Sequence, residues 1–263
     1  MNATQATDIA PLLPPERGPV TALRRVIDAM APPARDARQG VVPFRVADLD
    51  HALGGGLALG ALHEIAAARE SEIAAATGLA LALASRQPRP VLWVAEDMAL
   101  AESGIPYGPG LDDLGLDPER LVTVTAAKTR DVLWVMEEAL TCRGVGAVIG
   151  EIRSPCLDLI ATRRLSLAAG RREALALLLR THPGTDASTA ATRSIVGAEP
   201  SAPHAQGSGP PRLALTLTRN RRGPLGSWHL EWNRVERRFD LAPAHREPVA
   251  QAAFHRPHRS AGA

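Results

Sequence analysis

The segment between Leu49 and Arg86 carries the pattern with the clearest chemical meaning in the chain. It begins LDHALGGGLALGALHEI and continues AAARESEIAAATGLALALASR. In many ATPases this continuation is a glycine-rich loop that ends in Gly-Lys-Ser/Thr. Backbone N–H groups of that loop hold the phosphates, the lysine neutralises them, and the hydroxyl binds Mg²⁺. Here no lysine stands anywhere between Ala66 and Arg86.

The residues at the loop positions are unsuited to a phosphate ligand. An alanine replaces the opening glycine, and an isoleucine followed by alanines stands at the place of the lysine. Two glutamates bring negative charge to the phosphate position, where repulsion in a shielded site costs on the order of several kcal/mol. The sequence therefore predicts a degenerate nucleotide loop without conventional ATP hydrolysis, formed by Ala67, Ala68, Glu70, Ser71, Glu72, Ile73 and Ala74.

Two further acidic residues stand where parallel strands are expected to end. Glu96 follows the apolar segment PVLWVA, and Glu151 follows GAVIG. Such a carboxylate can orient a water or hold Mg²⁺, but without a phosphate site it has nothing to activate. We expect both to be vestigial. We expect no cofactor. We also expect no metal, because Cys142 and Cys156 have no metal-ligand spacing.

Alternating strands and helices must position these residues. Short apolar strands are expected at residues 61–66, 90–95, 120–125, 146–150 and 174–179. Helices are expected at 71–86 with Ser71 as N-cap, after Thr129 as a cap, and at 157–169, and a Gly- and Pro-rich loop at 104–110. Strands separated by helices of this length predict a parallel, doubly wound sheet.

After His182 the pattern changes. A turn-rich loop at residues 183–189 leads to a candidate strand at 190–197, and the alternating segments 213–218 and 228–232 are typical of antiparallel strands. On the last strand, Trp228 and Trp232 share one face and are expected to pack into the core.

Composition divides the chain into a core and its ends. We expect disorder at residues 1–19, a helix at 20–30, a linker at 31–43, the core at 44–240 and a disordered basic tail at 241–263. His255 and His258, and the segment 251–254, are expected to be solvated. With 263 residues, 45% of them hydrophobic, the chain suits one sizeable core.

Several function classes are disfavoured. No apolar run reaches the about 18 residues of a membrane span, and the N-terminus lacks the pattern of a secretion signal. Two isolated cysteines indicate reduced thiols in a cytoplasmic protein. From Pro210 onward ten arginines meet four acidic residues, whereas the rest is slightly acidic. A basic end can attract nucleic acid or an acidic partner.

The motifs and their order resemble the RecA family. VLWVAED resembles the strand that ends in RecA's water-positioning glutamate, matched by Glu96, and the segment ending GAVIGE places Glu151 at the acidic position of the next ATPase motif. REALALLLRTH brings His182 near the start of a DNA-binding loop. RLALTLTRNRRGPLGSWHLEW matches the following strand pair, in which Arg219, Asn220 and Arg221 correspond to a triplet that reaches a neighbouring subunit's nucleotide. The resemblance implies a RecA-like α/β fold.

More narrowly, five segments resemble the inducible mutagenesis protein A (ImuA) family, a RecA/SulA-like group: ALGGGLALGALHEI, ATRRLSLAA, LALLLRTHP, AATRSIVGAEPSAP and GSWHLEW. The likeness covers about residues 44–240. It implies a cytoplasmic protein, associated with the nucleoid when induced, of the DNA-damage (SOS) response. It also implies translesion mutagenesis beside an inactive Y-family polymerase relative and an error-prone C-family DNA polymerase.

The basic turn of residues 219–222 is the strongest candidate for partner binding. Three arginines in four residues repel one another unless anions or acidic groups face them. We hypothesise that Arg219, Asn220, Arg221 and Arg222 bind the ATP site of an active RecA subunit and cap a filament end. Further partner candidates are Arg163, Arg164 and Trp134. Contact with DNA, if any, would fall to Arg193, Arg219, Arg221 and Arg222, because the loop 183–189 has no Lys or Arg.

Three alternatives remain open at this point. A SulA-like cell-division inhibitor would bind the division GTPase, and its overexpression should give filamentous cells without external damage. A recombination ATPase would bind nucleotide with Mg²⁺. A plain DNA-binding protein would show a steep salt dependence, lost when the arginines of residues 219–222 are neutralised.

Overall fold

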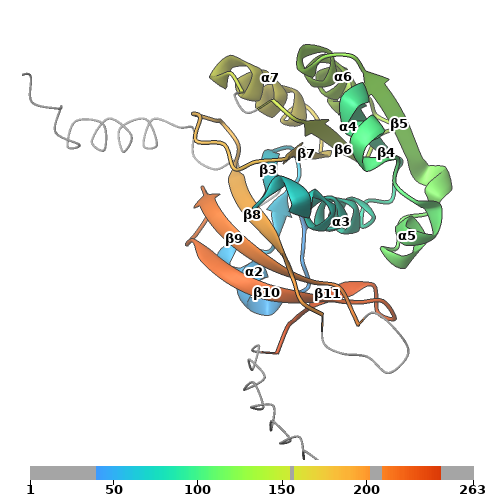
Figure 1. Ribbon diagram of the computed structural model, residues 1–263. Coiled ribbons are helices and arrows are strands. Elements are labelled where there is room, and N and C mark those ends of the chain that lie inside the picture. The colour runs from blue at the N-terminus through green and yellow to red at the C-terminus, as the bar shows by residue number, and fades with distance from the viewer. Residues whose placement is uncertain (1–39, 155–156, 202–208, 244–263) are drawn as a thin grey trace, which may run out of the picture. The chain divides into compact units, whose positions relative to one another are not determined.

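A computed structural model describes residues 40–154, 157–201 and 209–243 (Figure 1). The predictions for residues 1–19 and 20–30, for most of the linker, for Cys156 and for the tail from residue 244 concern positions outside these ranges. The first described strand, β1 (Val41–Val42), pairs antiparallel with β2 (Leu57–Ala58) and lies within the segment 31–43 assigned to a linker.

A nine-stranded sheet forms the centre of the described part of the chain, in the order β11-β10-β9-β8-β3-β7-β6-β4-β5. The six strands from β8 to β5 run parallel, and β9, β10 and β11 extend the sheet antiparallel. Their bounds are β3 Leu62–Ala67, β4 Val91–Glu96, β5 Leu121–Ala126, β6 Ala147–Ile152, β7 Leu175–Arg180, β8 Thr192–Glu199, β9 Arg212–Asn220, β10 Gly226–Asn233 and β11 Arg238–Leu241. The predicted parallel sheet with an antiparallel C-terminal extension is confirmed.

Helices cover both faces of the sheet (Figure 1). One face carries α2 (Ala47–Ala52), α3 (Ile73–Ala84), α4 (Asp97–Ser103) and α5 (Gly108–Asp113), whose apolar side chains pack with those of β9 and β10. The other face carries α6 (Thr129–Thr141) and α7 (Leu159–Ala169). Two short 3₁₀ turns, η1 (Glu70–Glu72) and η2 (Pro118–Arg120), complete the connections. The core is built mainly from Leu, Ala, Val and Ile.

Three local predictions are wrong. Helix α3 begins at Ile73, because Ser71 lies within η1 and makes no capping hydrogen bond. Thr129 does not cap α6 either: its hydroxyl donates to Glu96 Oε1 at 2.6 Å. The segment 104–110 is not a loop throughout, because α5 begins at Gly108. In each case tertiary contacts or a short helix replaced the local pattern.

The two tryptophans of β10 pack inward as predicted. Trp232 is buried, meets Phe239 of β11 edge to face at 4.8 Å between ring centroids, and donates from Nε1 to the carbonyl of Asp113 at 3.1 Å. Trp228 is half-buried and packs against the same core cluster. The antiparallel extension is therefore anchored to α5 and to the main core.

Candidate functional site

The degenerate loop lies at the carboxyl ends of the parallel strands, where β3 leads through η1 into α3. Ala67 is fully buried, and the N–H of Ala68 donates to the carbonyl of Val196 on β8 at 2.7 Å. Glu70 and Glu72 occupy the first turn before α3, and Glu72 is ion-paired with Arg69. The chain thus supplies its own carboxylates at the helix start, where a phosphate-binding loop would receive an anionic ligand.

Arg153, the residue directly after β6, organises this edge of the sheet. Its Nη1 lies 2.6 Å from Glu102 Oε2 and 3.3 Å from Glu70 Oε1, and its Nη2 donates to Ser103 Oγ at 2.8 Å. Glu151 Oε1 lies 4.0 Å from the same Nη2. With only 15% of its side chain exposed, this guanidinium links η1, α4 and β6 across the expected nucleotide position.

Glu96 and Glu151, the two acidic residues expected to be vestigial, have different environments. Burial raises the pKa of the Glu151 carboxyl; the neighbouring Arg153 lowers it and Glu96 raises it further. Glu151 Oε1 accepts no hydrogen bond from the described residues, which agrees with this carboxyl being a poor anion. Glu96 is half-buried and accepts a hydrogen bond from the Thr129 hydroxyl.

His182 also belongs to this edge, since its Nε2 lies 3.8 Å from Glu70 Oε2 and its Nδ1 is 2.9 Å from Thr181 Oγ1. The structure therefore brings together Glu70, Glu151 and His182, three residues that the sequence singled out separately. It adds Arg153 and Glu102, which sequence reasoning missed. The one available signal was an arginine two residues after the acidic position that ends a predicted strand.

A second ionic network lies beneath the loop 183–189. Glu64 of β3 is buried and accepts from Arg193 Nε of β8 at 2.7 Å and from the Ser188 hydroxyl. Arg180 of β7, itself buried, lies 3.9 Å from the same carboxylate and 3.6 Å from Asp186. Arg193, expected to be available for DNA, instead directs its guanidinium into this network and also donates to the carbonyl of Asp186 at 2.9 Å.

The basic turn of residues 219–222 is largely held by contacts within the chain. Arg219 donates to the carbonyl of Ser188 at 2.6 Å, and Arg222 donates to that of Gly54 at 3.1 Å. Asn220 bridges the carbonyls of Ala52 and Pro224 and accepts from the N–H of Arg222. The backbone carbonyls of Ser188 and Gly54 therefore supply the negative ends that Arg219 and Arg222 require. Arg221 is the exposed member of the triplet.

Two helices carry the remaining partner candidates. Trp134 of α6 is 59% exposed, and Arg163 and Arg164 of α7 are also exposed. Arg164 Nη2 lies 2.6 Å from Glu137 Oε2 of α6, so one of the two arginines already has an acidic partner within the chain. Ile160 and Leu167 of α7 are exposed apolar residues on the same helix.

Within residues 40–154, 157–201 and 209–243, no three His, Cys, Asp or Glu residues come together in a way that could hold a metal ion. No helix in the same ranges has the length and apolar character needed to cross a membrane.

Fold and site together define a RecA-like α/β domain in which the chain's own side chains form an ionic cluster at the carboxyl ends of the parallel strands. The structure is similar to the crystal structure of the RadB recombinase, with a TM-score of 0.56, covering 77% of this chain and 100% of that chain. The two sequences are 17% identical, so this likeness shows the fold alone.

Sequence comparison gives the family. The chain is 35% identical over 196 residues to Protein ImuA of Caulobacter vibrioides, in strain NA1000 / CB15N and in strain CB 15. Each alignment covers 68% of this chain and 77% of the relative. No protein-family model matches the chain. The chain belongs to the ImuA family, as the five quoted segments predicted.

Proposed function

We propose that this protein is a non-catalytic adaptor in DNA-damage-induced mutagenesis, acting through contacts with other proteins. Its partners would be RecA, an inactive Y-family polymerase relative and an error-prone C-family DNA polymerase, as the family resemblance implies. Membership of the ImuA family supports the process. The observation that carries the non-catalytic role is the ionic cluster of Arg153 with Glu70, Glu102 and Glu151, here called the Arg153 cluster. It lies at the edge where a RecA-like ATPase holds its nucleotide.

Electrostatics oppose a nucleotide at this edge. One guanidinium, from Arg153, is surrounded by the carboxylates of Glu70, Glu102 and Glu151. A nucleotide triphosphate carries several negative charges and would have to displace these ion pairs. The α3 start offers no compensation, because Glu70 and Glu72 already stand there. Binding would therefore bring anions together in a partly shielded place, where repulsion is strong.

The first prediction concerns nucleotide binding. We expect no saturable binding of Mg²⁺–ATP or ADP at concentrations up to about 1 mM, which is an affinity of about −4 kcal/mol. The Arg153→Ala variant should also fail to bind, because it removes the guanidinium that is ion-paired with Glu70 and Glu102 and leaves their carboxylates at this edge. Calorimetric titration measures both, with an active RecA as positive control. Saturable binding that the variant abolished would contradict the proposal.

The outer face of α6 and α7 is the candidate contact for the polymerase partners. Trp134 lies one turn before Glu137, and Ile160 lies one turn before Arg164, so these apolar side chains stand at the same level beside the bridge. A large exposed aromatic residue with exposed aliphatic neighbours is typical of protein interfaces. We define the helix-pair face as Trp134, Ile160, Arg163 and Leu167.

The second prediction tests this face by affinity capture from DNA-damaged cells with mass spectrometry. RecA and the mutagenic polymerase partners should copurify with the tagged chain. Trp134→Ala/Ile160→Ala should reduce recovery of the polymerase partners by at least about tenfold, the usual loss for interface anchors. The matched control is Tyr107→Ala/Leu225→Ala, which removes two equally exposed apolar residues elsewhere. Equal losses in both variants would rule out this face.

The same capture distinguishes the other readings. Arg221→Ala/Arg222→Ala should lower RecA recovery alone if the basic turn binds RecA's ATP site, while Arg219 and Asn220 are left in their internal contacts. Recovery of the division GTPase, without RecA or polymerases, would favour the SulA-like alternative. Filamentous cells on overexpression without damage would support that alternative independently.

A further inference from the structure

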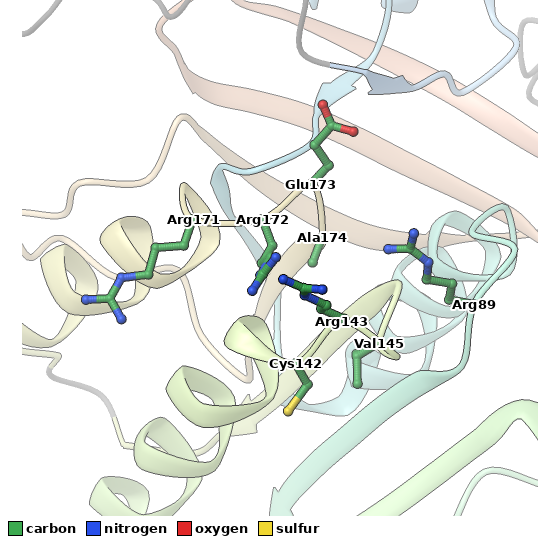
Figure 2. A pocket seen from close by; sticks show the side chains of 8 residues that line it. All are labelled: Arg89, Cys142, Arg143, Val145, Arg171, Arg172, Glu173 and Ala174. Atoms are coloured by element: carbon green, nitrogen blue, oxygen red, sulfur yellow. The ribbon is translucent and has the colours of Figure 1, made fainter.

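A shallow depression lies at the opposite edge of the sheet from the Arg153 cluster. Its volume is about 350 Å³ (Figure 2). It is formed by the turns that precede β4, β6 and β7, so it lies at the amino ends of three neighbouring parallel strands. The lining residues are Arg89, Cys142, Arg143, Val145, Arg171, Arg172, Glu173 and Ala174.

The depression is strongly cationic. Arg89, Arg143, Arg171 and Arg172, here called the arginine cluster, line the depression together with a single acidic residue, Glu173. All four arginines are exposed, and none forms an ion pair with another described residue. Figure 2 shows the guanidinium groups of Arg89, Arg143 and Arg172 turned toward one another, whereas the Glu173 carboxylate points away.

The usual reason for arginines at such turns does not account for this cluster. Arginines after helices commonly donate to the last helical carbonyls. No such hydrogen bond from these four guanidinium groups exists within the described ranges, although Arg222 and Arg219 elsewhere do donate to carbonyls. The donors of four guanidinium groups are therefore left to water in the free protein.

The backbone beneath the arginine cluster is rigidly tied. The N–H of Gly146 donates to the carbonyl of Pro90, and the N–H of Leu175 donates to that of Gly146, both at 2.9 Å. Arg120 also donates to the carbonyl of Arg89 at 3.0 Å. A Cβ atom at Gly146 would lie 3.0 Å from the Arg89 Cβ, so the close approach of these turns suits glycine. The cluster is thus presented on a preorganised base.

We propose that the arginine cluster binds the phosphodiester backbone of DNA without reading its base sequence. Guanidinium groups form paired, charge-assisted hydrogen bonds to phosphate oxygens. The lining has no aromatic ring on which a base could stack, and only Val145 and Ala174 are aliphatic. A protein partner would require an apolar centre to exclude water, so phosphate backbone fits this surface better than a polypeptide. The inference does not depend on the proposed adaptor role.

The test is fluorescence anisotropy with the full chain and a labelled DNA of about 30 nucleotides, single-stranded or duplex, between about 50 and 200 mM salt. Arg143→Ala/Arg172→Ala should weaken binding by at least about tenfold. It should also flatten the salt slope by about 1.4 on single strands, or about 1.8 on duplex. The matched control is Lys128→Ala/Arg130→Ala, which removes the same charge from exposed positions at the start of α6. Arg143→Lys/Arg172→Lys should retain much of the binding, since it keeps the charge.

Three outcomes would overturn the proposal. Equal weakening by the site and control variants would assign the effect to net charge or to the basic tail. No measurable binding at about 50 mM salt would exclude DNA. Arginine-dependent binding of hexaglutamate in the absence of DNA binding would assign the surface to an acidic protein segment. Unchanged circular dichroism and unfolding midpoints of the variants establish that the fold is intact, and the capture experiment reports on the adaptor role separately.

Discussion

Replacing Glu64 by Gln is expected to lower the free energy of unfolding by about 3–5 kcal/mol. The Glu64 carboxylate is buried and faces two guanidinium groups, Arg193 at 2.7 Å and Arg180 at 3.9 Å. An amide removes the negative charge but leaves both cations in place, with Asp186 as the remaining acidic partner of Arg180 at 3.6 Å. Removing one member of a buried ionic group is costly because the other charges stay without compensation.

The measurement is urea unfolding followed by circular dichroism at pH 7, comparing wild type with Glu64→Gln. Glu119→Gln is the matched control, since Glu119 is exposed and its side chain makes no ion pair with the described residues. The control should change the free energy of unfolding by less than about 0.5 kcal/mol. A similarly small change in Glu64→Gln would mean that backbone carbonyls and Asp186 suffice to hold both arginines.

The Glu64 network explains why part of the site could not be predicted. The apolar runs of β4, β6 and β7 report their own burial, so the parallel sheet follows directly from sequence. Glu64 and Arg193, however, are 129 residues apart, and Glu70 and Arg153 are 83 residues apart. No local pattern links such pairs. Arg193 therefore looked available for DNA until the strand order β8-β3 placed it beside Glu64.

The two predicted helix N-caps, Ser71 and Thr129, were wrong for a related reason. Ser and Thr before an apolar run favour an N-cap locally, but the Thr129 hydroxyl is used by Glu96, which arrives from the end of β4. The absence of a Gly-Lys-Ser/Thr motif, in contrast, can be read directly from the sequence, because recognising a missing residue requires no knowledge of tertiary partners. What the sequence did not reveal was the position of Arg153, which forms ion pairs with Glu70 and Glu102 at this edge.

Charge counting along the sequence did not point to the arginine cluster. The basic excess begins at Pro210, yet Arg219 and Arg222 donate to carbonyls of their own chain. The arginine cluster comes entirely from the slightly acidic part. Its members are brought together only because turns that precede parallel strands meet at one edge of a sheet. The surface follows from topology rather than from composition.

The two edges of the sheet consequently differ in charge. At the carboxyl edge, Glu70, Glu102 and Glu151 outnumber Arg153, which disfavours phosphate. At the amino edge, four arginines stand beside one acidic residue, which favours phosphate. A RecA-like ATPase holds its anionic ligand at the carboxyl ends of the strands. In this chain the carboxyl ends are acidic and the amino ends are basic, so we expect any polyanion to bind at the amino ends of the strands.

Acidification is expected to destabilise the fold through His63. This side chain is fully buried on β3, with Nε2 2.9 Å from the carbonyl of Ala58 and Nδ1 2.8 Å from Thr192 Oγ1. Burial lowers the pKa of the His63 imidazole to about 4, against the small opposing effect of the Ala58 carbonyl and with a further lowering by Arg222. The carbonyl requires a proton on Nε2, so the neutral ring accepts from the Thr192 hydroxyl through Nδ1.

The direction in which pH changes the free energy of unfolding follows from proton binding. Between pH 6.5 and about 4 the unfolded chain protonates this histidine while the folded chain does not, so the free energy of unfolding falls as the pH falls through this window. The lowering of the His63 pKa from 6.5 to about 4 corresponds to a loss of about 3 kcal/mol in the free energy of unfolding by pH 4. This free energy is fully recovered above pH 7. Denaturant unfolding at several pH values measures the loss.

His63→Gln separates this effect from the titration of carboxylates. The variant is expected to be less stable at pH 7, because it alters both hydrogen bonds, but to lose about 3 kcal/mol less than wild type on acidification to pH 4. His51→Gln is the control, since that side chain is exposed on α2 and makes no hydrogen bond or ion pair with the described residues. Its unfolding is measured at the same pH values. Parallel pH curves for wild type and His63→Gln would show that His63 is not held neutral, and that a protonated ring is accommodated between β3 and β8.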